Sequence, residues 1–250
     1  MKLFTKTLAA SLCAAAFTLA APQVSAETVS ILNNGEATPP GVGSVTVSVT
    51  GRNPADPAAF GRLNAGGFGV TVKANDTVPG TFEVGQNLLA WCVSLALHFP
   101  IRSTSSFDVL TNPGDSWVGA LTSLYTQFGS AVNNAVTSAA MQLAIWEVVE
   151  ETDGSYNLGD GTFQAKAPNP DAGAAIDQAN VWLGWLNDNK DAATNKYKLV
   201  KLESVRDPKY QDLVTFVPTP LPGAALLFLS ALGLGGLARR KQSVQGPVAA

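Results

Sequence analysis

The stretch Asn87-Leu88-Leu89-Ala90-Trp91-Cys92-Val93-Ser94-Leu95-Ala96-Leu97-His98-Phe99 decides how this chain folds, and Pro100 follows it directly. Large apolar residues alternate along it with small or polar ones, which predicts a buried β-strand, because successive side chains in a strand point to opposite faces. One face carries Leu89, Trp91, Val93, Leu95 and Leu97, and the other carries Ala90, Cys92, Ser94, Ala96 and His98. The face that holds Cys92 is lined with small residues, so another element can approach it closely.

Four further segments have strand character. Residues 44–50 place Val45, Val47 and Val49 on one face and hydroxyl residues on the other, which predicts a half-buried antiparallel strand. Residues 69–73 are similar, and residues 199–202 and 213–217 are expected to be the last strands. Gly, Pro, Asn and Asp are frequent between these segments and indicate turns.

Three helices are predicted, near residues 115–128, 138–151 and 171–187. The second is expected to begin with a hydroxyl cap at Thr137 or Ser138, and the third with Asp171 as its cap. In the second helix, Gln142 shares an apolar stripe with Ile145, Trp146 and Val149. An amide on an apolar stripe is unusual, because a buried amide must find hydrogen-bond partners.

Strands interrupted by helices in the middle of the chain predict an α+β fold, a β-sandwich or barrel with a helical insertion. We expect one exported domain at residues 27–217, a length that fits a single domain with a sizeable core. All 19 acidic residues lie in it, whereas five of the 16 lysines and arginines lie in the terminal segments. Nucleic acid is therefore not expected as a partner, because phosphate binding requires a basic surface.

The N-terminus has the pattern of a secretory signal peptide at residues 1–26. Lys2 and Lys6 precede an apolar run, and Val24-Ser25-Ala26 offers small residues for cleavage after Ala26. Removal of this segment, with Cys13, leaves Cys92 as the lone cysteine. A lone cysteine in an oxidising compartment is buried and inert, paired between chains, or chemically special.

The C-terminal segment, residues 218–250, combines prolines, an apolar run at 221–238 and the basic cluster Arg239-Arg240-Lys241. An apolar run of this length is at the lower limit for a membrane-spanning helix, and a basic cluster stays on the cytoplasmic side. From Val217-Pro218-Thr219-Pro220 to the basic cluster, the arrangement resembles the PEP-CTERM sorting signal, although Thr219 stands where that family usually has Glu. The resemblance implies processing by an exosortase-type membrane protease. It also implies a transient inner-membrane anchor, followed by release to the cell surface or an exopolysaccharide matrix.

A second resemblance concerns two short segments. Trp91-Cys92-Val93 and Gln142-Leu143-Ala144-Ile145-Trp146-Glu147 resemble the thioester domains of bacterial surface adhesins. The resemblance implies that Cys92 donates the sulfur and Gln142 the acyl group of an internal thioester. It further implies that Trp91 and Trp146 pack beside the bond, and that an amine-bearing target becomes attached. The chain differs from the family at Met141, where Thr is usual, and it lacks the acidic residue that often follows the cysteine.

These observations leave two classes of function open: covalent attachment through a thioester, and a non-covalent structural or carbohydrate-binding matrix protein. An enzyme is not expected, because His98 is the only histidine and no nucleophile-elbow serine is present. One histidine and one remaining cysteine make a zinc site improbable, so no metal or cofactor is predicted.

Overall fold

The computed structural model describes residues 27–35, 43–51, 55–77, 79–151, 154–189, 192, 196–205 and 209–219. The elements in chain order are β1 (Glu27–Gly35), β2 (Val45–Val49), β3 (Gly61–Ala65), β4 (Phe68–Asn75), β5 (Asn87–Cys92), β6 (Thr104–Leu110), α1 (Val118–Phe128), the short 3-10 helix η1 (Gly129–Ala131), α2 (Ala135–Glu150), β7 (Ala165–Lys166), α3 (Pro170–Asp188), β8 (Tyr197–Ser204) and β9 (Leu213–Pro218). The predicted signal peptide with Ala26, and the tail residues Pro220, 221–238, Arg239, Arg240 and Lys241, lie outside the described residues.

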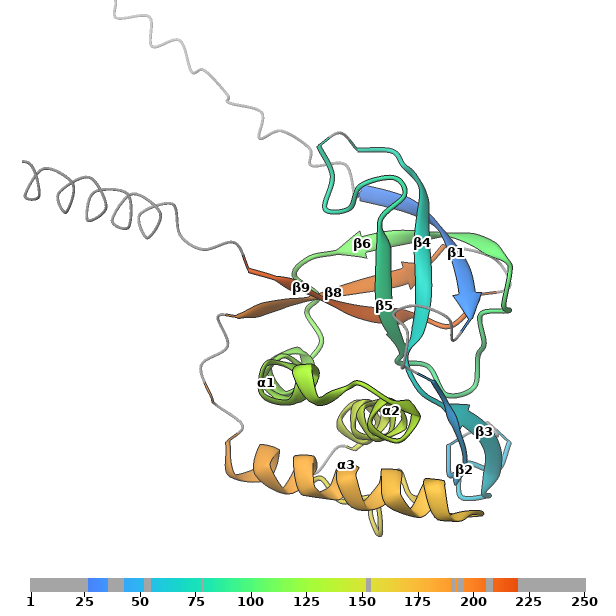
Figure 1. The fold of residues 1–250 in the computed structure, drawn as a ribbon, viewed down its shortest axis with the longest axis vertical. Helices are drawn as coiled ribbons and strands as arrows, with labels where there is room; N and C mark the ends of the chain where they lie inside the picture. The colour runs from blue at the N-terminus through green and yellow to red at the C-terminus, as the bar shows by residue number, and fades with distance from the viewer. Residues whose placement is uncertain are drawn as a thin grey trace, which may run out of the picture.

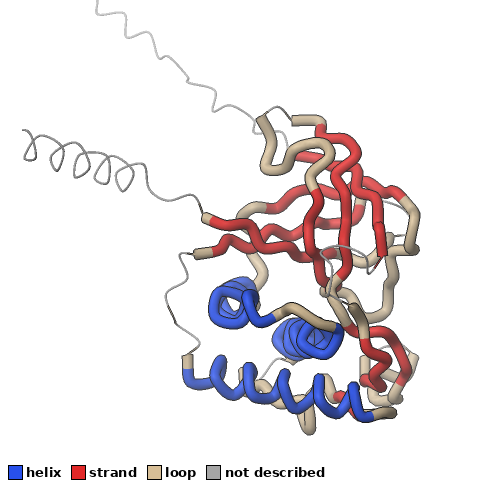
Figure 2. The backbone as a smooth tube through the Cα atoms, viewed as in Figure 1, coloured by secondary structure: helices blue, strands red, loops and turns tan. Residues whose placement is uncertain are grey.

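The strands form a closed antiparallel barrel in the order β1-β4-β5-β9-β8-β6 and a separate three-stranded sheet in the order β3-β2-β7. All three α-helices come between β6 and β8 in the chain and gather on one side of the barrel (Figures 1 and 2). In Figure 1, α1 and α2 lie next to the barrel and α3 packs beyond them. The sequence prediction of an α+β fold with a helical insertion is therefore confirmed, and the barrel is the correct alternative.

Two hydrophobic cores share the wall of the barrel. The barrel interior contains residues such as Ile31, Val72 and Phe107, all fully buried. The larger core lies between the barrel, the helices and the small sheet. Strand β5 contributes to both, because Ala90 belongs to the barrel interior whereas Trp91 belongs to the larger core. Because both faces of β5 are buried, most of its residues are apolar.

The segment predicted as one strand over residues 87–99 is shorter in the structure, and this prediction was wrong in its extent. Strand β5 ends at Cys92, and residues 93–99 form turns and loop. Val93 still pairs once with the neighbouring segment, because its N–H donates to the carbonyl of Asp212 at 3.1 Å. The end of the strand places Cys92 at the rim of the barrel, where helix α2 lies.

The helix caps also differ from the prediction. Helix α2 is capped by Asn134, whose side chain accepts the N–H of Thr137, while the Thr137 hydroxyl accepts the N–H of Asn134. Helix α3 is capped by Asn169 instead of Asp171, with Pro170 in its first turn. Asparagine accepts such bonds at least as well as serine or aspartate. As a result, α2 begins at Ala135 and α3 at Pro170, three residues and one residue before the predicted starts.

Among the described residues, we find no helix with the length and apolar character needed to span a bilayer.

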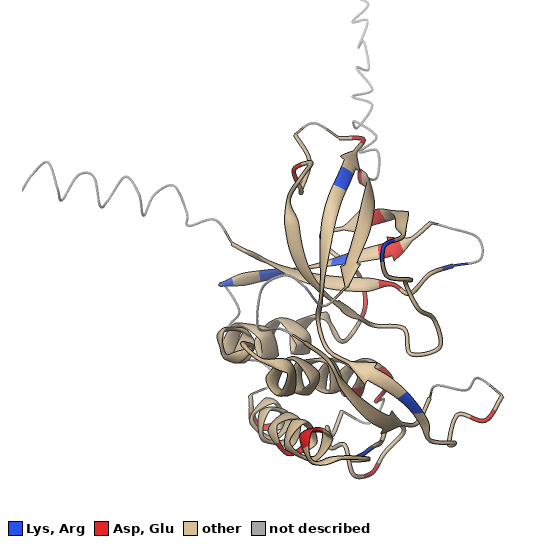
Figure 3. Cartoon of the chain, turned by 45° about the vertical axis from the view of Figure 1, so that its right-hand side comes forward, with Lys and Arg blue, Asp and Glu red and all other residues tan. Residues whose placement is uncertain are grey.

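Figure 3 shows the charged residues dispersed over separate elements of the barrel and the helical layer. One ion pair joins the segment before α1 to the barrel, at 3.2 Å between Lys201 Nζ and Asp115 Oδ2. The two side chains are 14% and 31% exposed, so this pair is partly buried. Buried contacts between the helices and the rest of the fold act alongside it.

The Ser138 hydroxyl is one of those contacts, since its oxygen accepts the N–H of Gly67 at 2.8 Å in the interior. We predict that Ser138→Ala lowers the free energy of unfolding by about 1–3 kcal/mol, because a buried N–H then lacks a partner. Urea denaturation measures this, with Ser130→Ala as the control, since Ser130 is an exposed serine at the end of the preceding helical segment. Equal effects of the two substitutions would contradict the proposed role of the contact.

Candidate functional site

Helix α2 carries three side chains with hydrogen-bonding atoms at intervals of four residues: Ser138, Gln142 and Trp146. This interval places them one above the other on a single helix face. All three are buried, at 0%, 1% and 3% exposure. Ser138 bonds the segment before β4, Gln142 bonds the end of β5, and Trp146 lines a pocket at the same end of the barrel. The stripe is thus the edge by which α2 docks on the barrel.

Gln142 forms a paired hydrogen bond with the backbone of Cys92. Its Oε1 accepts the Cys92 N–H at 3.0 Å, and its Nε2 donates to the Cys92 carbonyl at 2.8 Å. Two atoms of one amide thereby satisfy both backbone groups of one residue, as a neighbouring strand would. The structure brings together the two residues that the sequence singled out, 50 positions apart.

The geometry of β4 explains why a side chain takes this place. Pairing between β4 and β5 ends at Phe68 opposite Ala90, and continuing that register would set Gly66 opposite Cys92. The chain instead turns away at Gly66 and Gly67, and Gly67 bonds Ser138. A Cβ on Gly67 would lie 2.9–3.0 Å from the side chains of Leu89 and Trp91, closer than side chains tolerate. Glycine at position 67 allows the chain before β4 to pack closely against β5 where the pairing of these two strands ends. The place beside Cys92 that β4 leaves open is filled by the side chain of Gln142.

The Cys92 thiol is an uncharged group in the resting protein. Burial raises its pKa from the ordinary value of 9.0 to about 12, and a hydrogen bond with the Gln211 side chain opposes only part of this effect. The thiolate is the nucleophilic form of cysteine, so a thiol with so high a pKa is unreactive towards ordinary solutes at neutral pH. Any reaction of this sulfur therefore depends on a partner held beside it.

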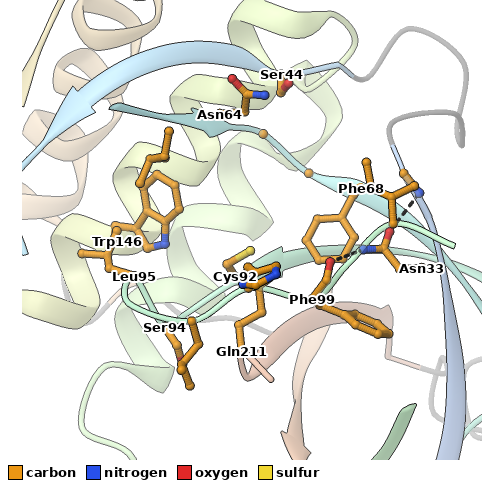
Figure 4. Close-up of a pocket in the computed structure, with 17 residues that line it drawn as sticks. Asn33, Ser44, Asn64, Phe68, Cys92, Ser94, Leu95, Phe99, Trp146 and Gln211 are labelled. Atoms are coloured by element: carbon orange, nitrogen blue, oxygen red, sulfur yellow. Dashed lines mark hydrogen bonds between the residues drawn. The ribbon is translucent and has the colours of Figure 1, made fainter. Parts of the chain in front are cut away.

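A pocket of about 290 Å³ opens beside Cys92, between the barrel rim and the small sheet. Figure 4 shows Cys92, Gln211 and Trp146 on one side of it and Phe68 and Phe99 on another. Amide, hydroxyl, aromatic and aliphatic side chains line it, and no Asp, Glu, Lys or Arg is among the described residues of its wall. The exposed His98 also belongs to this wall. The site thus offers hydrogen-bonding groups in a largely apolar setting.

The two tryptophans that were expected beside the thioester, Trp91 and Trp146, occupy different parts of the structure. Trp146 lines the pocket, with its ring 6.3 Å from that of Phe163. Trp91 is fully buried in the larger core and makes edge contacts with Tyr125 and Phe216, at 5.4 and 5.8 Å between ring centroids. Trp91 therefore supports β5 from the helical side, whereas Trp146 reaches the pocket itself.

Sequence reasoning missed two members of the site. Ser138 carries a recognisable signal, since it stands one helical turn before Gln142 on the same stripe. Gln211 lies just before β9, 119 positions from Cys92, and no local pattern connects it to the cysteine. The pairing of Cys92 with Leu213 and the hydrogen bond from the Val93 N–H to the Asp212 carbonyl bring that segment to the site.

The first residues of the predicted sorting motif belong to the barrel. Val217 pairs with Lys198 and Pro218 with Tyr197 in the ladder between β8 and β9. The N–H of Thr219 donates to the carbonyl of Lys196 at 3.0 Å. The barrel therefore includes the first proline of the motif, one residue beyond the predicted domain boundary at Val217.

No protein-family model matches the chain, and a sequence search finds no match among curated proteins. The structure is similar to the N-terminal domain of the Streptococcus pyogenes pilus tip adhesin Cpa, with a TM-score of 0.44 and 14% sequence identity. The similarity covers 77% of this chain and 94% of that chain. At this TM-score the resemblance is weak, and the function proposed below rests on the geometry of the site.

The Gln142 carboxamide is predicted to stabilise the fold even without a covalent bond. In a Cys92→Ala background, which excludes a thioester, Gln142→Met should lower the free energy of unfolding by about 2–5 kcal/mol, because two buried backbone groups lose their partners. Met141→Leu in the same background is the control; Met141 is fully buried on the same helix and the swap conserves volume, so a loss below about 1.5 kcal/mol is expected. Similar losses for both substitutions would show that the paired hydrogen bond contributes nothing specific.

Proposed function

We propose that this chain is an exported surface or matrix protein that attaches covalently to amine-bearing targets through a thioester between Cys92 and Gln142. The observation that carries the proposal is the hydrogen bond from the Cys92 N–H to Gln142 Oε1 at 3.0 Å. It fixes the carboxamide on the residue that bears the thiol and polarises the carbonyl that the sulfur would attack.

The bond would form by acyl transfer within the protein. The sulfur of Cys92 attacks Cδ of Gln142, the C–N bond breaks, and the thiol proton leaves with the nitrogen as ammonia. The Nε2 hydrogen bond to the Cys92 carbonyl, 2.8 Å in the resting amide, is given up in this step. No cofactor or oxidant is consumed, because the reaction exchanges one acyl bond for another.

Attachment would follow by attack of a neutral amine on the same carbon. The amine nitrogen forms an amide, the C–S bond breaks, and the proton released by the amine goes to the sulfur. Gln142 is 1% exposed, which protects the acyl carbon from bulk water, while Cys92, which Gln142 contacts, lines a pocket that a small nucleophile can enter. Each molecule reacts once, so the protein acts as a reagent and not as a turnover enzyme.

A second function, a non-covalent structural or carbohydrate-binding matrix protein, is favoured by a specific observation as well. Both polar atoms of the Gln142 carboxamide are already satisfied by the Cys92 backbone, as in a purely structural contact. In that case the thiol with its raised pKa is an unreactive, partly buried group in the pocket wall. The two functions differ in a covalent bond, which a mass measurement detects.

Intact mass is therefore the decisive test. The purified protein should be lighter by the mass of one ammonia than the sequence between its measured termini, and methylamine should add to it with release of a thiol that alkylating reagents detect. Cys92→Ala should show the sequence mass and no methylamine adduct. A freshly purified, reagent-free protein with its full sequence mass and a free Cys92 thiol would refute the covalent proposal.

We also propose the delivery route: export through residues 1–26, temporary retention in the inner membrane by residues 221–238, and processing by an exosortase-type protease near Pro218 and Pro220. Strand β9 ends at Pro218, so the barrel does not need the segment beyond Thr219. Deleting residues 220–250 should leave the melting temperature unchanged and move the protein from the membrane fraction to the soluble exported fraction. Persistence in the membrane fraction after the deletion would argue against this route.

A further inference from the structure

Trp146 carries a polar atom without a partner in the wall of the pocket. The residue is 3% exposed, and its indole Nε1 has no hydrogen-bond partner among the described residues. An indole N–H only donates, and a buried donor without an acceptor costs free energy. Native proteins seldom keep such a group without a use for it.

The position of Trp146 relates this donor to the acyl group. Trp146 follows Gln142 by one helical turn, and helical side chains lean towards the N-terminus, which brings the indole over the turn that bears Gln142. Figure 4 shows the nitrogen-bearing edge of the ring turned towards Cys92. The N–H therefore points towards Cys92, the residue whose backbone holds the carboxamide of Gln142.

We propose that the Trp146 N–H is an oxyanion donor of this site, which binds the acyl oxygen when the carbonyl carbon becomes tetrahedral. This inference rests on the thioester proposed above. The Cys92 N–H already donates to Gln142 Oε1, so Trp146 adds a second donor, from the helix, to the one from the strand.

The electrostatic setting strengthens such a pair of donors. As an amine attacks Cδ, the carbonyl electrons move onto oxygen, and they return when the C–S bond breaks and the sulfur takes the proton. The charged intermediate would form at Gln142, which is 1% exposed, beside a pocket whose described wall contains His98 but no Asp, Glu, Lys or Arg. Fixed dipoles are worth more at a buried position than in water, because little solvent competes with them there. The unpartnered N–H in the resting protein is then a donor held ready for a charge that appears during reaction.

The test compares the full-length wild-type protein with Trp146→Phe, which keeps an aromatic ring against Phe163 but removes the N–H. Methylamine is the probe, and the rate of its addition is followed by intact mass. We expect addition to slow by about 10²–10³-fold, as for the loss of one oxyanion donor. A folded variant that fails to lose ammonia at all also supports the inference, because formation of the bond passes through the same tetrahedral carbon.

Trp182→Phe is the matched control. Trp182 is also 3% exposed and packs in the same core, stacked on Phe128, but it does not line the pocket. It should lose a similar ring volume and leave the rate of methylamine addition within a few-fold of wild type. Melting temperatures of both variants separate an effect on folding from an effect on reaction.

A second substitution removes the N–H with almost no change of shape. Site-specific incorporation of 3-benzothienylalanine at position 146 keeps a bicyclic ring and replaces the N–H by sulfur. It should slow addition as Trp146→Phe does, even if the phenylalanine variant folds poorly. Addition at the wild-type rate in this variant would overturn the inference and leave the thioester standing. A wild-type protein that retains its full mass would overturn both proposals.

Discussion

The structure depends on the pairing of one side-chain amide with the backbone of Cys92. Where β4 leaves the ladder, the N–H and C=O of Cys92 lose their strand partner, and Gln142 supplies both bonds at 3.0 and 2.8 Å. Neither partner can be buried alone, because an unpaired polar group in the interior is costly. The strand end and the helix therefore fix each other. Once Gln142 is placed, the positions of Ser138 and Trp146 on α2 follow from the helical repeat.

The same pairing underlies the chemistry proposed for the site, and the burial of the site explains why its thiol is unreactive at rest. The bond that holds the carboxamide also polarises its carbonyl, while burial keeps the thiol protonated, with a pKa of about 12. The Gln142 carboxamide thus contacts the residue that bears the thiol, and the thiol itself stays protonated. In such a site, reactivity is governed by the donors around the acyl oxygen and by access through the pocket, more than by the intrinsic nucleophilicity of the sulfur.

The sequence predicts those parts of the fold that have a local signal. The alternating valines of β2 are buried as expected, and the α-helices lie where their apolar periodicity placed them. Gln142 stood out because an amide interrupted an apolar stripe.

The strands β1, β3 and β6 were missed: β1 has two irregularities in its register with β4, and β3 alternates exposed and half-buried residues. The end of β5 at Cys92 was missed because the apolar run continues to Phe99, and only tertiary packing shows that α2 displaces the ladder there. The role of Gln211 depends on a long-range strand pairing, which no spacing reveals.

Strand β9 connects the site to the proposed delivery route. Its first residue, Leu213, pairs with Cys92, whereas its last, Pro218, pairs with Tyr197. Five residues of extended chain separate the two ends by about 17 Å, since a strand rises about 3.4 Å per residue. The segment that would anchor the protein therefore leaves the barrel at the end of β9 that is remote from Cys92. A tether at that end, as proposed, would therefore be attached about one strand length from Cys92. Strand β9 also pairs with β5 from Ala90 to Cys92, so loss of β9 would leave that edge of β5 without its partner. The last barrel contact of this segment is the hydrogen bond from the Thr219 N–H to the Lys196 carbonyl, so the proposed cleavage would leave the barrel intact if it falls beyond Thr219.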